Sequence, residues 1–425
     1  MNQFIFESKQ KTVLLGFIIL GVVCLGLSFV MDGTPHHTRF WSNLLHNTVY
    51  FTGISFVSLF ALAAFTTAYA GWHTVMKRIW EAYSLFLIVG LGFLVIIIAG
   101  LWGHMHHLYH WGMDGVADPN SPNYDSILAG KAGFLNKYVY TFGTIIVVSV
   151  WYFFAVRLRK LSVAEDTMGG DANFTYHRRI RVFAGIFLPI AAFTSAALIW
   201  QWVMSIDAHW YSTLYAWYST ASWFVGSLGL TILTLIYMKS KGYFQNVTEE
   251  HMHDLGKYLF AFSVFWTYLW FSQFMLIWYG NNGEETVYYQ IRRDEYPVLY
   301  FGNLIINFVL PFLILMRNST KRKFGTLAFV SIICFFGHWW DYFYMIKPGA
   351  LINAQHADHA AHAAGEHGHQ AAEFMMGFSI PGLLELGTFL GFTALFMYFA
   401  FHHMSKASLE PVHDPYLGES LHHHV

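Results

Sequence analysis

Residues 77–103 read KRIWEAYSLFLIVGLGFLVIIIAGLWG, and this stretch decides the class of fold. Two basic residues open it, and an almost uninterrupted apolar run follows. A helix rises about 1.5 Å per residue, so roughly 20 apolar residues cross the roughly 30 Å core of a bilayer. Because that core holds no water to satisfy free backbone groups, such a segment must be helical. The stretch therefore predicts a transmembrane helix at residues 80–103.

The composition of the whole chain agrees with a membrane protein. Of its 425 residues, 56% are hydrophobic and only 12% are charged, whereas about a quarter of the residues in a soluble domain are charged. The net charge of −1 and the lack of a long basic run give no sign of a nucleic-acid partner. Similar apolar runs predict an all-α polytopic protein with about ten transmembrane helices, at 12–31, 47–70, 80–103, 137–156, 181–206, 213–238, 256–279, 297–316, 324–346 and 379–403.

Basic residues in the connecting segments predict the orientation. If the N-terminus is cytoplasmic, most of the 24 Lys and Arg residues fall in connections on the cytoplasmic side. The clusters within 157–160, 178–181 and 317–323 are typical of that side under the positive-inside rule. One missing span would destroy this alternation of basic-rich and basic-poor connections. We therefore expect both termini to be cytoplasmic.

The chain shows no soluble domain and no linker rich in Pro or Gly, so we expect a single integral membrane domain over residues 1–425. A weak internal echo relates residues 200–210, at the end of the fifth span, to residues 338–341, at the end of the ninth. Internal duplication is common in membrane proteins. The echo predicts two four-helix bundles, at 47–206 and 213–346, flanked by the first and last spans.

Residues 347–378 are predicted to form a flexible outer loop, because they contain a low-complexity run of Ala and His. Histidine-rich tracts bind metals well only with a fixed geometry, so we expect no metal site there. The cysteines Cys24 and Cys334 give no disulfide framework, and no CxxCH or CxxC motif is present for haem c or an iron–sulfur cluster. We expect no metal and no redox cofactor on this chain.

Polar groups within the predicted spans need an explanation, because a charge at the membrane centre costs about 2.5–3.5 kcal/mol on insertion scales. Taken singly, each is most simply a packing contact between helices. Taken together, groups on at least four helices, mostly near the outer ends, indicate a polar half-cavity open to the outside. The candidates for a proton path are Glu81, Gln201, Asp207, His209, Gln273, Glu284, Glu285, His338, Asp341 and Glu385.

Three stretches resemble a known family. Residues 204–213, MSIDAHWYST, and 270–279, WFSQFMLIWY, leading to residues 284–285, are similar to signature segments of the membrane protein designated F in bacterial alternative complex III. Residues 77–81, KRIWE, are similar as well. That protein belongs to the polysulfide-reductase type (NrfD/PsrC-like) of membrane subunits, which are built from two four-helix bundles. At matching positions the resemblance implies outer-side candidates at Asp207, His209, Gln273, Glu284 and Glu285, and the inner-side candidate Glu81.

The resemblance implies a role in electron transport. Such a complex oxidises quinol in the bacterial inner membrane and passes the electrons to a periplasmic cytochrome or to a terminal oxidase. Its haem c groups and iron–sulfur clusters lie on other subunits. The implied partners are a related membrane subunit, an iron–sulfur subunit, cytochrome c subunits and lipids. The chain itself is expected to be a non-catalytic subunit with a structural and proton-translocating role.

Two other functions stay open from the sequence. A stand-alone secondary transporter suits ten helices and an internal repeat, although Pro189 and Pro311 interrupt two predicted spans without a central charge beside them. A quinol-binding subunit suits His46 or His338 beside Asp341, since an imidazole and a carboxylate accept protons near neutral pH. Oxidation of quinol also requires an electron acceptor nearby, for which this sequence shows no motif.

Overall fold

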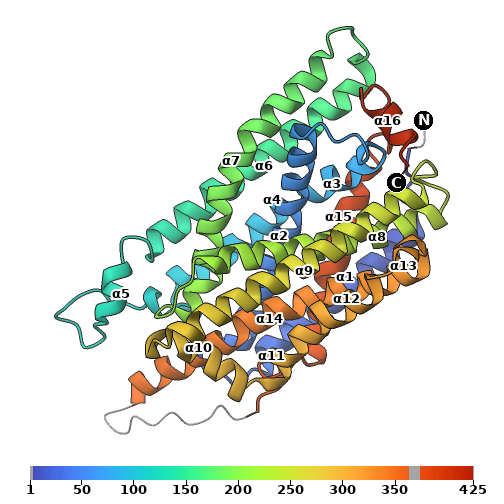
Figure 1. Ribbon diagram of the computed structural model, residues 1–425. Helices are drawn as coiled ribbons and strands as arrows, with labels where there is room; N and C mark the ends of the chain where they lie inside the picture. Colours follow the sequence, from blue (N-terminus) through green and yellow to red (C-terminus); the bar gives the residue numbers. More distant parts are fainter. Residues whose placement is uncertain (1–2, 363–373, 425) are drawn as a thin grey trace.

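The computed structural model describes residues 3–362 and 374–424. Within these ranges the chain is helical, and the only β pairing is two isolated bridges. Figure 1 shows the long helices lying side by side along one axis, with the N- and C-termini at the same end. We call that end the terminal face. The opposite end, which holds α5 (Ser126–Lys131) and α10 (Gly283–Asp294), is the distal face.

Among the described residues, ten helical segments are long and apolar enough to cross a membrane, which confirms the predicted all-α polytopic fold. They comprise α1 (Ser8–Val30), α2 (Thr38–Thr67), α3 with α4 (Lys77–Ser84, Leu87–Trp102), α6 (Lys137–Met168), α7 (Thr175–Trp202), α8 (Leu214–Ser240), α9 (Glu249–Gly280), α11 with α12 (Pro297–Leu304, Leu310–Leu315), α14 (Phe324–His362) and α15 (Leu383–Met404). The shorter elements are η1 (Pro35–His37), η2 (Thr74–Met76), η3 (His110–Gly112), η4 (Met204–Asp207), the π turn η5 (Ile305–Val309), α13 (Asn318–Arg322) and α16 (Leu417–Leu421).

Several helices extend past their predicted bounds, among them α6, which continues to Met168, and two of these extensions add polar residues at the opposite face. Helix α2 begins at Thr38 rather than at residue 47, so the polar residues before that position are helical too. Helix α14 continues to His362 instead of ending at 346, so the first half of the loop predicted at 347–378 is helical. Alanine is the strongest helix former, and this Ala-rich run prolongs the helix. The part of the predicted loop at 363–373 lies outside the described residues.

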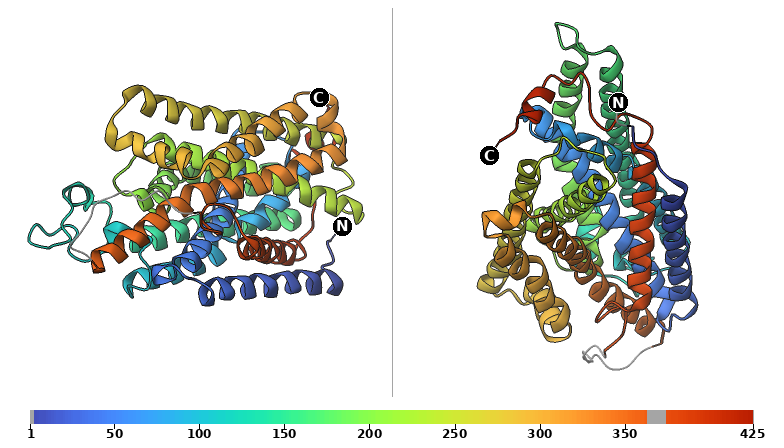
Figure 2. Two further views of the ribbon diagram at one scale, coloured as in Figure 1. Left: turned by 90° about the horizontal axis from the view of Figure 1, so that it is seen from below. Right: turned by 90° about the vertical axis from the view of Figure 1, so that its right-hand side faces the viewer.

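Helix α1 lies along α15 at the edge of the molecule (Figure 2). Gly21 and Gly391 face each other so closely that a Cβ on Gly21 would lie 2.5 Å from the Cα of Gly391. Small residues of this kind let membrane helices approach. The buried residues of α1 are Gly21, Cys24 and Ser28, while apolar side chains such as Val22 are exposed. One small-residue stripe thus attaches α1 to the rest of the protein.

The remaining spans form two groups, which meet at the three central helices α2, α8 and α14. Helix α2 contacts α3, α4 and α7, and α6 contacts α4 and α7, which closes the first group. Helix α8 contacts α9 and α14, and the interrupted helix α11–α12 packs between α9 and α14 to close the second. The groups meet where α2 touches α8 and α14. Most residues of α2 and α8 are buried, so the junction is enclosed in protein. The division of these helices into four-helix bundles at 47–206 and 213–346 stays a prediction.

Candidate functional site

One carboxylate is fully enclosed where α8, α9, α11 and α14 meet. Asp341 lies near the middle of the apolar part of α14 and has no accessible surface. It accepts hydrogen bonds from Tyr218 Oη, from Trp266 Nε1 at 2.9 Å and from Asn303 Nδ2 at 2.7 Å. A buried charge needs donors or a counter-ion. All three donors are neutral, which suits a carboxyl group that gains and loses a proton.

The donor Asn303 belongs to an interrupted helix. Between α11 and α12 the chain forms the π turn η5 at Ile305–Val309, and Pro311 follows directly. Single π turns recur at functional sites. Asn307, within the turn, donates to Asn303 Oδ1 at 2.6 Å and to the carbonyl of Gly337 at 2.9 Å. Only glycine fits there, because a Cβ on Gly337 would lie 2.2 Å from Asn307 Oδ1. The hydrogen bonds of Asn307 therefore fix the side-chain amide of Asn303, which donates to Asp341.

His338 lies one turn before Asp341 and also faces α8. Its Nδ1 is 2.9 Å from Ser222 Oγ, and its ring lies edge-on to Trp266. Its Nε2 is buried without a hydrogen-bond partner. The sequence predicts both residues near the outer edge, but α14 runs well past residue 346, so they lie near its middle. The predicted depth of the two residues is therefore wrong, and their role in a proton path stays a prediction.

Helix α8 carries a row of buried hydroxyl groups that leads from the enclosed carboxylate toward the terminal face. Ser58 Oγ on α2 is 3.0 Å from Ser227 Oγ. Nearer the terminal face, Trp80 Nε1 donates to Thr231 Oγ1 at 3.1 Å, and Tyr83 Oη lies 2.5 Å from Thr234 Oγ1. We call this set the α8 hydroxyl row; its members are Tyr218, Ser222, Ser227, Thr231 and Thr234.

The phenol of Tyr50, from α2, fills the gap in the row between Ser222 and Ser227. A Cβ on Gly226 would lie 2.6 Å from Tyr50 Oη, so the glycine makes room for the phenol. Tyr50 Oη donates its proton to the carbonyl of Phe335 at 2.6 Å. Transfer of protons along the row therefore requires this hydroxyl to rotate away from the backbone.

Glu81 lies at the end of the same region nearest the terminal face. It accepts hydrogen bonds from Arg78 Nη1 at 2.9 Å, Arg159 Nη1 at 3.1 Å and Ser162 Oγ at 2.7 Å. All four residues are buried. The flanking aromatic residues of α3 reach the α8 hydroxyl row, whereas the Glu81 carboxylate bonds to α6. Two guanidinium groups hold this carboxylate in its charged form.

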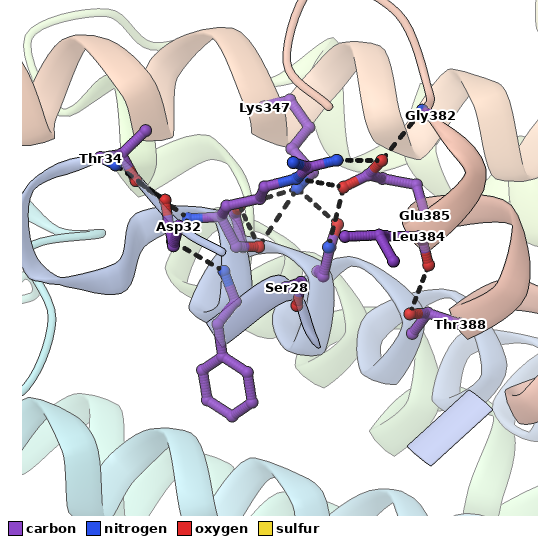
Figure 3. Close-up of polar contacts among 12 residues, drawn as sticks. Ser28, Asp32, Thr34, Lys347, Gly382, Leu384, Glu385 and Thr388 are labelled. Carbon is purple, nitrogen blue, oxygen red and sulfur yellow. Dashed lines mark hydrogen bonds and ion pairs between the residues drawn. The ribbon is translucent and has the colours of Figure 1, made fainter. Parts of the chain in front are cut away.

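Glu385 forms a second closed carboxylate site, in the first turn of α15 (Figure 3). Arg39 on α2 donates to its two oxygens, with Nε at 2.8 Å and Nη2 at 3.0 Å. Asn43 Nδ2 and the backbone N–H of Gly382 add bonds of 3.1 Å and 2.9 Å. Lys347 Nζ, from α14, lies 2.5 Å from Asn43 Oδ1. This network joins α2, α14 and α15 through two cations and one carboxylate.

Asp207, predicted on the outer side, is ion-paired near the distal face. Arg292 Nη2 on α10 donates to Asp207 Oδ2 at 2.8 Å. The guanidinium carbon lies 3.5 Å from the ring centre of Tyr288. Burial lowers the pKa of Arg292, but the Asp207 carboxylate outweighs burial and leaves that pKa above its ordinary value. The guanidinium of Arg292 is therefore charged at any physiological pH.

Three further candidates make separate contacts toward the distal face. His209 Nε2 lies 2.5 Å from Asp125 Oδ2, and Gln273 Nε2 donates to Tyr289 Oη at 2.8 Å. Gln201 Nε2 reaches only a backbone carbonyl, at 3.5 Å. Burial raises the pKa of Asp125, but the hydrogen bonds from His209 and from two backbone N–H groups together outweigh burial and lower the pKa. None of these residues shares a hydrogen bond with the Asp341 cluster.

The last two candidates lie at the surface, Glu284 fully exposed and Glu285 partly exposed. A cavity of about 340 Å³ opens near them, lined mainly by apolar groups with Lys131, Trp200 and Trp210 among them. None of the ten sequence candidates lines it. The candidates that are buried bind protein partners instead of one shared cavity. The expected polar half-cavity is therefore not what the described residues form.

Sequence reasoning missed the partners of these carboxylates. It places Arg39, Arg159 and Lys347 in connections, but each lies on a helix that extends past its predicted end. It places Arg78 in a connection as well, although this residue lies three positions before Glu81 and hence on the same helix face. That spacing was the one signal that could identify an ion pair in advance.

Comparison with family models and with characterised proteins finds no match for this chain. The fold defines the class of protein: a polytopic, all-α integral membrane protein. Among the described residues, its polar interior holds carboxylates paired with cations, such as Glu385, and a carboxylate held by neutral donors, Asp341.

Proposed function

We propose that this chain is an integral membrane component of a quinol-oxidising respiratory complex of the alternative complex III type. In this proposal it lies in a bacterial inner membrane with both termini cytoplasmic, so the terminal face is the inner side. The protein has a structural role and relays protons. Haem c and iron–sulfur clusters belong to partner subunits, beside a related membrane subunit and lipids.

Two of the three stretches that resemble the family, residues 204–213 and 270–279, support the proposal by meeting in one place. Asp207, from residues 204–213, pairs with Arg292 on α10. Trp210, from the same stretch, stacks on Tyr288 of α10, with ring centres 4.0 Å apart. Gln273, from residues 270–279, also bonds to α10. Segments distant in sequence thus build one distal structure, as expected if they share a role.

The observation that carries the relay role is Asp341, enclosed among neutral donors at one end of the α8 hydroxyl row. Oxidation of a quinol releases its hydroxyl protons, while the electrons pass to cofactors on partner subunits. His338 and Asp341 are suited to take up and release single protons, and hydroxyl groups pass protons by rotation. Intramembrane ionisable groups of this kind mark proton relays in pumps and transporters.

Purification tests whether this chain is a subunit of a quinol-oxidising complex. The chain, carrying an affinity tag and expressed in its own cell, should be recovered in mild detergent with haem-bearing subunits and with quinol-oxidising activity. Recovery as a lone monomer, under conditions that keep other respiratory complexes intact, would reject the proposal.

A second experiment tests the relay in the assembled complex. Asp341→Asn removes the titrating group, and Glu81→Gln removes the proton-path candidate nearest the terminal face. We expect Asp341→Asn to lower the proton-to-electron ratio while quinol oxidation and subunit composition persist. The matched control is Glu284→Gln, which changes an exposed carboxylate and should leave the ratio unchanged. An unchanged ratio in Asp341→Asn would remove the relay role.

One observation favours a second candidate, a stand-alone secondary transporter. The expectation that no central ionisable group accompanies Pro311 is wrong, because Asp341 binds Asn303 on the same interrupted helix. Interrupted helices beside a buried carboxylate are typical of transporter sites. Proton-coupled uptake by liposomes that contain only this chain would decide for the transporter.

A further inference from the structure

Three side chains that carry metal-ligating groups meet at the terminal face, and none of them is a proton-path candidate. Glu165 lies in the last turns of α6, His177 in the first turn of α7, and Asp414 in the C-terminal segment after α15. One ligand atom from each lies within 4.8 Å of the others. The sequence predicted no metal site and did not select these residues. Their convergence depends on the C-terminal segment folding back over α6 and α7.

The polar atoms of this cluster lack the hydrogen bonds that buried groups normally have. His177 is 8% exposed and Glu165 is 2% exposed. Neither ring nitrogen of His177 has a hydrogen-bond partner, and Glu165 Oε2 has none either. The closest approach between the two side chains is 3.8 Å, from His177 Nδ1 to Glu165 Oε1. Most buried polar atoms are satisfied by protein or water, so unsatisfied atoms facing one another indicate a missing ligand.

The charges around the cluster do not balance. Lys77 Nζ is bonded to Asp414 and lies 3.9 Å from Glu165 Oε2. Arg78 is bonded to Glu81 and to Asp166. In this connected group the carboxylates are Glu81, Glu165, Asp166 and Asp414, and the cations are Lys77, Arg78 and Arg159. One negative charge is left over, and Glu165 is the carboxylate without a hydrogen-bonded cation.

We propose that Glu165, His177 and Asp414 bind one divalent cation of the Zn²⁺ class. Two carboxylate oxygens and one imidazole nitrogen are ligands that Zn²⁺ accepts, with water in the fourth position. Tetrahedral ligands at 2.0–2.1 Å from the metal lie about 3.3 Å apart, so the three side chains close by roughly 1.5 Å on binding. A cation here supplies the missing positive charge and satisfies the free nitrogen of His177.

The metal fastens the C-terminal segment to α6 and α7. Existing contacts already dock that segment: Lys77 pairs with Asp414, the Val412 N–H donates to Asp166 Oδ1 at 3.1 Å, and the ring of Tyr416 lies 5.4 Å from that of His177. Asp414 is the only ligand on the segment itself. Metal binding therefore makes docking of the C-terminal segment depend on the free concentration of the metal.

Zinc retention by the full-length chain tests the site. Because residues 356–369 contain further histidines, every arm uses a background in which those histidines are replaced by Asn. Purified protein is equilibrated with Zn²⁺ at graded free concentrations set by a chelator, and bound zinc is counted by atomic emission. We expect one tightly held Zn²⁺ per chain, with His177→Ala weakening it by about 100-fold or more.

The matched control is His413→Ala, which removes the neighbouring imidazole that contacts only the backbone of Glu165. This variant should hold zinc within about 3-fold of the parent. Equal loss in both variants, or no stoichiometric zinc in the parent, overturns the proposal.

A further variant separates binding from misfolding. Lys77→Met removes the ammonium group that competes for Asp414, so it should tighten zinc binding by about 10-fold. Damage to the fold would weaken binding instead. Hydrogen exchange of residues 405–424 supplies an independent readout: zinc should slow it in the parent and leave it unchanged in His177→Ala. Unchanged or weaker binding in Lys77→Met contradicts the proposal.

Discussion

The two enclosed carboxylates Glu385 and Asp341 have the same burial and opposite surroundings. Neither side chain has accessible surface, and each accepts a hydrogen bond from an asparagine amide. Glu385 also receives two bonds from the guanidinium of Arg39. Asp341 receives its remaining bonds from a phenol and an indole. The positive charge of Arg39 neutralises the Glu385 carboxylate, whereas only the dipoles of neutral donors surround Asp341.

The difference separates structural from functional use of a buried acid. A bidentate Arg–carboxylate pair is strong, directional and insensitive to pH near neutrality, so it fixes helices in place. A carboxylate surrounded by neutral donors can take up a proton without leaving a cation unpaired. These surroundings suit Glu385 to packing, and they suit Asp341 to the proton relay that we propose.

The largest effect is expected from Arg39→Met. This change leaves the Glu385 carboxylate enclosed without its main partner, and breaking a buried pair costs about 3–5 kcal/mol. The midpoint of thermal unfolding in detergent should fall clearly. The double variant Arg39→Met with Glu385→Gln should recover part of that loss, because the enclosed carboxylate is then neutral and only the Lys347 ammonium, held by Ser42 and Asn43, lacks a counter-charge. A double variant no more stable than the single one would contradict this account.

A smaller, pH-dependent effect is expected at Asp414, a paired carboxylate outside the membrane spans. Burial raises the pKa of Asp414, but the Lys77 ammonium outweighs burial and lowers the pKa from 3.8 to about 2. Because the folded pKa is the lower one, this stabilisation is present above about pH 4 and is lost as pH falls through 2. It amounts to about 2 kcal/mol.

Hydrogen exchange of the C-terminal segment, measured in chelator between pH 5 and pH 2, checks this prediction. Amide hydrogens of the segment should lose protection against exchange in the parent protein as the pH falls. Asp414→Asn should show no corresponding transition. The same transition in both proteins would assign it to other groups.

Asp341→Asn should cost less stability than Glu385→Gln, which leaves Arg39 unpaired. The amide of the variant still accepts from two donors but leaves one buried donor unmatched, at about 1–2 kcal/mol. Parallel melts of the two variants in the same detergent give the comparison. If Asp341→Asn were the more damaging change, Asp341 would belong with Glu385 as a structural residue.

The smallest effect is expected at an exposed pair. Arg293 and Asp294 contact each other at 2.7 Å, but both side chains are about half exposed. Water and salt screen such pairs, so they contribute little. Arg293→Ala should leave the melting midpoint unchanged within error, which sets the baseline for the three buried sites.

The sequence predicted the helices well and the contacts poorly. Hydropathy located every span, because the need to bury backbone groups in lipid acts within each segment. Hydropathy did not locate the start of α2 or the end of α14. The turns missed there carry Arg39 and Lys347, and neighbouring helices rather than lipid bury them. Such polar residues lower the mean hydropathy of a segment, although contacts with neighbouring helices stabilise them inside the protein.

The partners of the candidate residues were beyond reach for a different reason. Arg39 and Glu385 are 346 positions apart, so no local spacing relates them. The α8 hydroxyl row was visible in the sequence as Ser and Thr at helical spacing, yet such residues also bond to their own helix backbone. Only the packing of α2, α3 and α14 against α8 distinguishes a row of interhelical contacts from isolated ones.

The close crossing of Gly21 and Gly391 has a consequence for biosynthesis. Helix α1 is synthesised long before its main neighbour, α15. Until residues 383–404 have left the ribosome, the glycine face of α1 lacks the helix that covers it. Docking of α1 is therefore a late step of assembly, which waits for a helix encoded more than 350 residues downstream.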